Sequence, residues 1–368
     1  MDVVQLSIVF RYLALTLSIF VLSYLVFFKQ RKASLVFFGL FVLSYVSPNI
    51  SYVINNLGLR AEYPNLKFIP IGFYYFSMPL FYLYTKSLLE QVKPKELIAC
   101  LAAGTLEFFF MLILFVLPYE TSSAFHKSQY WLFLAIHGVF LNIFSLFFVF
   151  LTLSRIYRYH NKFLNFFSNT QKVNLNWIRN VAYMLLFVYL FQLISLFFEV
   201  KNAANIIYFV DSVISLFFVY WISIFAVKQP HIHTEFEVFD NSKIVVATKP
   251  DDLETIVSVL NSTKCYKNPN FTVVDLAELV NLHPKKVSQT INQFAHKNFN
   301  HFINEYRVKE AKKLLANPDY DILTIEAVYK DAGFNSKSVF NTVFKQETGE
   351  TPSTFKKKLK DVGICTDS

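Results

Sequence analysis

Glycine, cysteine and charged residues are all scarce in this chain of 368 residues. Its 8 glycines leave little material for phosphate-cradling loops, and the sequence contains no nucleotide-binding, zinc-protease or nucleophile-elbow motif. Its 3 cysteines have no CxxC spacing, which argues against a metal site. The sequence therefore predicts no metal, no cofactor and no enzymatic activity.

Apolar residues are abundant instead, at 54% of the chain against 17% charged residues, with 43 phenylalanines. Most of them lie in long apolar runs within the first 227 residues. A run of about 18 or more residues with few charges is typical of a membrane-spanning helix. The sequence predicts seven spans, at residues 3–28, 34–54, 68–89, 97–117, 130–153, 181–200 and 205–227.

The loops between these spans differ in charge. One set of loops holds 12 lysines and arginines and the opposite set holds 4. Basic loops stay on the cytoplasmic side of a membrane, so we expect the N-terminus outside and the C-terminus inside. This predicts a multi-pass membrane protein whose C-terminal part lies in the cytoplasm, with a lipid bilayer as its first partner.

Four ionisable residues are the clear cases of charge inside the expected spans, namely Arg11, Glu107, His137 and Asp211. Charges within a bilayer are costly, and a functional role is the default hypothesis for them. With the N-terminus outside, all four lie at or above the membrane midplane, which suits a pocket that senses a small molecule or a membrane signal. The alternative is structural: Arg11 pairs with Asp211 or Glu107 to hold the helices together, and His137 bonds a carbonyl.

The clearest pattern in the chain is at residues 322–355, which predict two short helices around a tight turn. Gly333 supplies the turn, Thr324 can cap the first helix, and Asn335 or Ser336 can cap the second. The second helix, up to about residue 346, has an apolar back. Its opposite face is polar and basic, as reading base edges and phosphates requires. That face comprises Lys337, Ser338, Asn341, Thr342 and Lys345.

The same plan occurs at residues 271–294. Thr272 and Asp275 have capping-box spacing, Asn281 stands where Gly333 stands in the later unit, and Pro284 opens the second helix. Residues 299–316 predict a long helix that joins the two units. In the earlier unit the residues facing away from the apolar back include Lys285, Ser288, Gln289 and Asn292.

Two helix-turn-helix units joined by one helix resemble the DNA-binding domain of AraC-type bacterial transcription regulators. The resemblance covers residues 272–358 and departs from the family pattern at Tyr329 and at Phe355-Lys356. By resemblance, Lys285, Ser288, Gln289, Lys337, Ser338 and Thr342 read bases, and the helical faces add Asn292, Asn341 and Lys345. The residues that carry the resemblance are Tyr306-Arg307, Ala311, Leu314-Leu315, Gly333-Phe334, Phe340, Phe344-Lys345, Gly349 and Thr351-Pro352-Ser353.

We therefore expect an all-α chain with three parts. Residues 1–227 form a seven-helix sensory domain, residues 228–263 a linker, and residues 264–368 a cytoplasmic DNA-binding domain with units at about 272–294 and 324–346. The last part contains 16 basic and 12 acidic residues, and its net charge of +4 permits DNA binding without being diagnostic. In the linker, residues 243–248 predict a short strand. Residues 251–262 predict an amphipathic helix that packs on its own domain or forms a dimer contact.

These features favour a membrane-embedded regulator that binds double-stranded DNA, with a homodimer as a further expectation. A second hypothesis is a seven-helix receptor whose helix-turn-helix tail docks a protein partner. The polar outward faces, which lack aromatic anchors, argue against it. A third is an enzyme within the bilayer, which requires Glu107, His137 and Asp211 to converge.

Overall fold

The computed structural model describes residues 3–27, 33–168, 175–195, 204–228, 247–317 and 324–364. Within these ranges every regular element is a helix, apart from one isolated β-bridge between Phe167 and Thr272. The expected all-α class is confirmed. The chain divides into two compact units, one of residues 1–157 and 175–235 and the other of residues 158–174 and 236–368.

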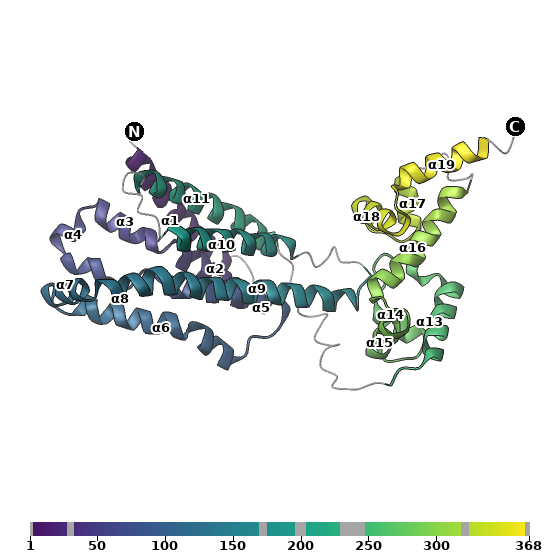
Figure 1. Cartoon of the computed structure of the whole chain (residues 1–368), viewed down its shortest axis with the longest axis horizontal. Helices are drawn as coiled ribbons and strands as arrows, with labels where there is room; N and C mark the ends of the chain where they lie inside the picture. The colour runs from purple at the N-terminus through teal and green to yellow at the C-terminus, as the bar shows by residue number, and fades with distance from the viewer. Residues whose placement is uncertain are drawn as a thin grey trace. The chain divides into compact units, whose positions relative to one another are not determined.

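The first unit is a bundle of apolar helices (Figure 1). Its elements are α1 (Val3–Phe27), α2 (Ala33–Val46), α3 (Pro48–Asn56), α4 (Leu59–Glu62), η1 (Pro64–Phe68), η2 (Tyr74–Phe76), α5 (Ser77–Leu89), α6 (Pro94–Val116), α7 (Tyr119–Ser128), α8 (Tyr130–Leu134), η3 (Ala135–Phe140), most of α9 (Leu141–Leu164), α10 (Asn176–Ser195) and α11 (Ala204–Lys228). The last turns of α9, from Arg158, group with the second unit.

Aromatic side chains fill the centre of this bundle. Helix α1 packs against α2 and α11, and α2 packs against α5. The Phe41 and Phe81 rings lie 5.1 Å apart, as do the Phe38 and Tyr84 rings, and all four side chains are buried. Such ring pairs add specific contacts to the apolar burial, so they fix how α2 and α5 meet.

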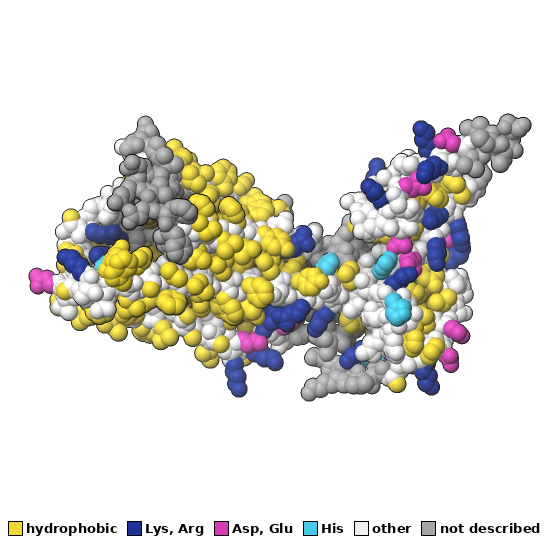
Figure 2. All heavy atoms as spheres, in the orientation of Figure 1, with side chains coloured by type: hydrophobic (Ala, Val, Ile, Leu, Met, Phe, Trp, Pro, Cys, Tyr) yellow, Lys and Arg dark blue, Asp and Glu magenta, His cyan; other side chains and the backbone are white. Residues whose placement is uncertain are grey.

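The outer surface of the bundle is also apolar. On α6, Ile98 is 70% exposed and Leu106 and Val116 are each 73% exposed. Figure 2 shows hydrophobic side chains over most of the visible face of the bundle, with charged side chains towards its ends. Apolar surface of this extent is unfavourable in water and suits a lipid environment.

Among the described residues, four helices are long and apolar enough to cross a membrane, and α2 with α3 makes a fifth if this bent pair counts as one span. The span expected at residues 68–89 is not one continuous helix. Its helical part, α5, has 13 residues, or about 20 Å, which is shorter than the ~30 Å hydrocarbon core. Pro70 lacks an N–H and lies in the irregular segment before it. Seven spans therefore stay a prediction.

The second unit is built around α16, which Figure 1 shows between the α14–α15 pair and the α17–α18 pair. Phe302 and Ile303 of α16 enter the hydrophobic core of the first pair, and Val308 and Ala311 enter that of the second. The elements are α13 (Pro250–Thr263), η5 (Cys265–Lys267), α14 (Val273–Leu279), α15 (Pro284–Phe294), α16 (Phe299–Ala316), α17 (Ile325–Asp331), α18 (Lys337–Thr348) and α19 (Pro352–Ile364).

The amphipathic helix expected in the linker is α13. Its Ile256 and Leu260 are fully buried in the core of the first pair, and Asp252 forms an ion pair of 2.8 Å with Lys286 of α15. These contacts show that α13 packs on its own unit. The strand expected at residues 243–248 lies mostly outside the described residues.

Candidate nucleic-acid interface

The first helix-turn-helix unit begins with the expected capping box. The Thr272 backbone N–H donates to the Asp275 carboxylate at 2.8 Å, and the Asp275 backbone N–H donates to the Thr272 hydroxyl. Asn281 has a φ of 51° and therefore supplies the left-handed turn, as predicted. Pro284 is the first residue of α15, where its missing N–H costs no hydrogen bond.

The second unit turns at Gly333, which has a φ of 93°. A Cβ atom at this position would lie 2.6 Å from the Tyr266 carbonyl oxygen, so the turn needs glycine for space as well as for conformation. Ser336 caps α18 by accepting from the Val339 N–H. Thr324 stands at the N-cap position of α17, but its side chain makes no capping hydrogen bond.

Helix α18 has the predicted polar front and apolar back. Phe340 and Phe344 are fully buried on its back. On its front, Asn341 is half-buried and the other residues are exposed, and the Thr342 hydroxyl donates to the Ser338 carbonyl at 3.0 Å. A polar and basic front over an apolar back provides hydrogen-bond donors for base edges and phosphates. The exposed residues are Lys337, Ser338, Thr342 and Lys345.

Helix α15 presents its face less completely. Asn292 is exposed and Lys285 and Gln289 are half-buried, whereas Ser288 is only 5% exposed. The outward position expected for Ser288 is therefore not observed. Its hydroxyl donates to the Asn165 carbonyl at 3.1 Å, and this partner comes from the end of α9, far away in the sequence.

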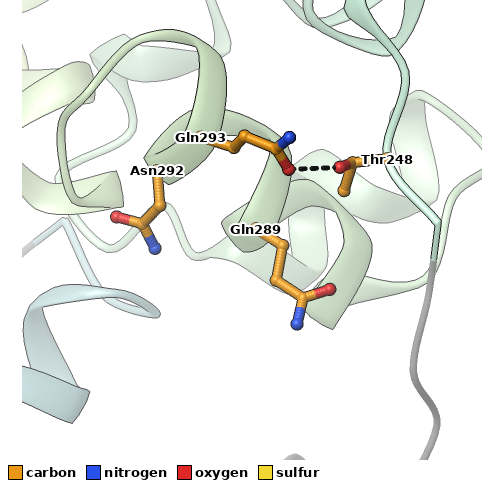
Figure 3. A pocket seen from close by; sticks show the side chains of 4 residues that line it. All are labelled: Thr248, Gln289, Asn292 and Gln293. Carbon is orange, nitrogen blue, oxygen red and sulfur yellow. Dashed lines mark hydrogen bonds between the residues drawn. The ribbon is translucent and has the colours of Figure 1, made fainter.

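A shallow polar pocket of 420 Å³ adjoins the same helix, lined by Thr248, Gln289, Asn292 and Gln293. Figure 3 shows Gln293 reaching Thr248 while Gln289 and Asn292 point away from that pair. The Thr248 hydroxyl donates to the Gln293 side-chain oxygen at 2.6 Å. The segment before α13 thus contacts α15, a feature that helical periodicity cannot reveal.

A buried arginine contacts both helix-turn-helix units. Arg307 of α16 is 2% exposed and donates to the carbonyls of Tyr266 and Asn268 at 2.8 Å each. Its guanidinium carbon lies 5.8 Å from the centre of the Phe334 ring, in the turn of the second unit. Burial lowers the pKa of Arg307 to about 10, which still leaves it charged at neutral pH. A charged donor in this position satisfies carbonyls that would otherwise be buried without partners.

The departures from the family pattern are accommodated by aromatic packing. Tyr329 is buried, with its ring 6.1 Å from that of Phe340. The Phe355 ring lies 5.5 Å from that of Phe344, in an edge-on arrangement. Both departures lie on the apolar side of α18, so the outward face is unaffected.

The sensory candidates in the apolar bundle fall into two groups. Arg11 donates to the Asn49 side-chain oxygen at 2.5 Å and lies over the Tyr52 ring at 4.1 Å. His137 lies near Tyr74 instead, with the two rings 5.8 Å apart, and Glu107 belongs to α6, which packs against the η2 turn that contains Tyr74. The side chain of Asp211 lies outside what the structure describes.

His137 also lies in η3, a turn of π-helix that interrupts an otherwise α-helical segment. Its Nδ1 atom is buried without a hydrogen-bond partner among the described residues. Turns of π-helix occur frequently at functional sites. Together these observations make Tyr74, Glu107 and His137 the more closely grouped part of the expected sensory set.

One group in the described part of the chain has metal-ligand geometry. The ligand atoms of His301, Glu305 and Glu347 lie within 4.8 Å of one another. His301 contacts Glu347 at 2.6 Å, and Glu305 forms an ion pair with Lys297. These contacts already account for the arrangement, because His301 with Glu347 ties the start of α16 to the end of α18 and Lys297 neutralises Glu305.

Part of this region matches a known protein family. Residues 276–358 match a family model described as a helix-turn-helix domain. The match covers both helix-turn-helix units, from within α14 to within α19. Searches of curated proteins and of solved structures gave no match.

Proposed function

We propose that the chain, which carries an AraC-type helix-turn-helix domain, is a sequence-specific DNA-binding transcription regulator embedded in the bacterial cytoplasmic membrane. Its apolar bundle senses a signal, and its helix-turn-helix domain binds double-stranded DNA on the cytoplasmic side. The two recognition helices enter successive major grooves, about 34 Å apart. A homodimer would extend the contact to a second half-site.

The observation that carries this proposal is the α18 face. Lys337 and Lys345 offer cationic donors, Ser338 and Thr342 offer hydroxyls, and all four are exposed on one helix whose back is buried. Lysines contribute affinity through phosphate contacts, and short polar side chains approach base edges closely. The face contains no exposed aromatic residue, which disfavours a protein-docking surface.

The direct test is selection of DNA by the full-length protein in lipid nanodiscs from a random-sequence duplex library. Regulators of this kind enrich a few sequences, and their affinity falls as salt rises because phosphate contacts release counterions. Uniform weak binding to all sequences, or none, would contradict the proposal. The selected duplex then serves as the probe for variants.

Single lysine variants test the assignment of the recognition helices. Lys337→Ala and Lys285→Ala should each weaken binding to the selected duplex by about 1–3 kcal/mol where the lysine contacts a base. The matched control is Lys313→Ala, which removes an exposed lysine from α16, away from both faces. Unchanged affinity in both test variants would exclude these helices as the DNA-reading elements.

Membrane embedding is supported by the apolar outer surface of the bundle and by its long helices. The excess of basic loops supports the proposed orientation. Labelling of single engineered cysteines with a membrane-impermeant reagent in intact cells tests it. A cysteine in α7 should react and a cysteine in α18 should not. The reverse pattern would place the helix-turn-helix units outside the cell and exclude a role on DNA.

For sensing, we propose the group formed by Tyr74, Glu107 and His137. Glu107→Gln and His137→Gln should shift the output of a reporter gene placed under the selected duplex. The matched control is Glu120→Gln, on an exposed position of α7. Equal output from all three variants would remove this group from the sensory mechanism.

A further inference from the structure

The end of α9 belongs to the DNA-binding unit. Helix α9 is continuous from Leu141 to Leu164, yet residues 158–174 group with residues 236–368 rather than with the bundle. The four residues after its end, Asn165–Ser168, lie on the first helix-turn-helix unit. We call this four-residue segment the strap.

Backbone hydrogen bonds hold the strap against the segment that leads into α14. The Val273 N–H donates to the Phe166 carbonyl at 2.9 Å, and the Ser168 N–H donates to the Phe271 carbonyl at 3.3 Å. These bonds flank the antiparallel bridge between Phe167 and Thr272. The strap therefore leaves α9 in a turn at Asn165 and Phe166 and pairs with the segment before α14 through the single bridge at Phe167.

Side chains of α16 anchor its end. Ser168 is 4% exposed, and its carbonyl accepts from the Asn300 amide at 2.8 Å. Its hydroxyl accepts from the Arg307 guanidinium at 3.0 Å. The Phe166 ring packs against the hydrophobic core of the first helix-turn-helix unit. The strap thus shares the buried arginine that joins the two helix-turn-helix units.

The start of the strap covers the DNA-reading face of α15. The Asn165 carbonyl accepts from the Ser288 hydroxyl at 3.1 Å, and the Asn165 side-chain oxygen accepts from the Asn292 amide at 3.4 Å. Ser288 and Asn292 lie one helical turn apart on one face. Bases present similar oxygen and nitrogen acceptors in the major groove, so Asn165 occupies the donors that a base pair would need. Among the described residues no such segment lies on α18, where Lys337, Ser338, Thr342 and Lys345 are exposed.

We propose that the strap is an autoinhibitory element that masks the first recognition helix and must leave it before both units can engage DNA. This inference rests on the proposed function, because it assigns a regulatory state to the same DNA-binding face. The strap continues directly from α9, a helix with a candidate span, so movement of α9 is the physical route by which the bundle controls DNA binding. Only the fraction of molecules with the strap released is fully competent, and the apparent affinity is reduced by that fraction.

Two opposite variants test the proposal in the full-length protein in nanodiscs, with the selected duplex as the probe. The release variant, Phe166→Ser with Ser168→Pro, removes the half-buried ring of Phe166 and the N–H and hydroxyl of Ser168. Its control is Tyr157→Ser, on α9 before the strap, at a position 68% exposed. The lock variant carries Asn165→Cys and Asn292→Cys with the native cysteines replaced by serine, joined by a short, reducible thiol cross-linker. Its control is Asn165→Cys alone, treated with the same reagent.

We expect the release variant to bind roughly 5- to 100-fold more tightly than the wild type, the range of a typical coupling between sites. Cross-linking should weaken binding at least about tenfold, and reduction should restore it, which also shows that the lock variant is folded. On addition of DNA, the Val273 amide should exchange its hydrogen faster while the amides of α15 exchange more slowly.

The outcomes separate the two proposals. If the lock variant binds the selected duplex equally well when cross-linked and after reduction, the strap is a structural element only and the proposed function stands. If the release variant loses binding while cross-linking still weakens binding reversibly, the release variant is misfolded and the proposal stands. If the release variant loses binding and cross-linking has no effect, the strap supports the fold and the proposal is overturned. If no form of the protein binds DNA selectively, both proposals are overturned.

Discussion

In the second helix-turn-helix unit the polar face of α18 is open to solvent, whereas in the first unit Ser288 on α15 is buried beneath Asn165. The two helices have the same plan: a capped start, an apolar back and a polar front. Their difference comes from a segment that is more than a hundred residues away in the sequence. Equivalent local patterns therefore do not guarantee equivalent accessibility, because long-range packing decides which polar faces stay exposed.

The turns of the two units differ in a related way. Asn281 and Gly333 both have positive φ, at 51° and 93°. Only Gly333 faces another backbone, with the Tyr266 carbonyl oxygen 2.6 Å from an added Cβ. The first turn thus needs only a residue that tolerates the left-handed region, while the second needs the absence of a side chain.

The largest expected effect on the comparison comes from Arg307→Ala. Its removal leaves the carbonyls of Tyr266 and Asn268 buried without their charged donor, at a cost of about 3 kcal/mol. Hydrogen exchange of peptides from α14 and α15 in the full-length protein measures it as a lower free energy of opening. Lys313→Ala, an exposed change on the same helix, should leave exchange unchanged. Equal effects of the two substitutions would show that the arginine network contributes little.

The next largest effect comes from exchanging the turn residues of the two helix-turn-helix units. Gly333→Asn should destabilise the second unit by roughly 3 kcal/mol, because the added side chain meets the Tyr266 backbone. The reciprocal Asn281→Gly should change the first unit by less than about 0.5 kcal/mol, since glycine tolerates the same φ. Hydrogen exchange in α17 and in α14 reports the two values. Similar costs at both turns would remove the steric distinction.

A serine pair sharpens the contrast between the covered and open faces. Ser288→Ala deletes a buried hydroxyl and its bond to Asn165, and should destabilise the first unit by about 1 kcal/mol. Ser338→Ala changes an exposed position on α18 and should alter stability by less than about 0.5 kcal/mol. The measurement is the opening free energy of α15 and α18 peptides. Equal and negligible effects would mean that α15 is as open as α18.

The smallest effect concerns the ion pair between α13 and α15, which only the first unit possesses. The hydrogen bond from Lys286 holds the pKa of Asp252 below its ordinary value of 3.8. A carboxylate with a lowered folded-state pKa stabilises the fold above its unfolded pKa, and this stabilisation is lost as pH falls through the folded value. Asp252→Asn should therefore cost about 0.5 kcal/mol at neutral pH.

This cost should shrink as the pH falls below 3.8, because the wild-type carboxylate becomes protonated as well. Asp251→Asn is the matched control, since Asp251 is exposed on the same helical turn. Hydrogen exchange of α13 peptides as a function of pH checks the prediction. A cost that is independent of pH would assign the role of Asp252 to helix capping rather than to the ion pair.

Much of the DNA-binding unit was predictable from local chemistry. The residues that start, turn and end its helices act within a few positions of themselves: Thr272 with Asp275, Asn281, Pro284, Gly333 and Ser336. The predicted joining helix coincides with α16, from Phe299 to Ala316. The apolar runs likewise predicted an apolar bundle, because long runs of such residues are unfavourable in water in any fold.

Other features depended on partners remote in the sequence. The grouping of Tyr74 with Glu107 and His137, and the pairing of Arg11 with Asn49, follow from how the bundle helices pack. The irregular segment before α5 shortened one expected span. The assignment of residues 158–174 to the DNA-binding unit had no signal in periodicity or composition.

The sequence by itself determined the helical class, the two helix-turn-helix units and the residues that form their polar faces, since each rests on contacts within about one helical turn. Only the tertiary structure decided which of those faces is free. Arg307 has donors for several carbonyls, and the fold supplies Ser168 as one of its partners. That anchor places Asn165 over Ser288, because the hydrogen-bonding needs of buried groups are met by whichever segment packs against them.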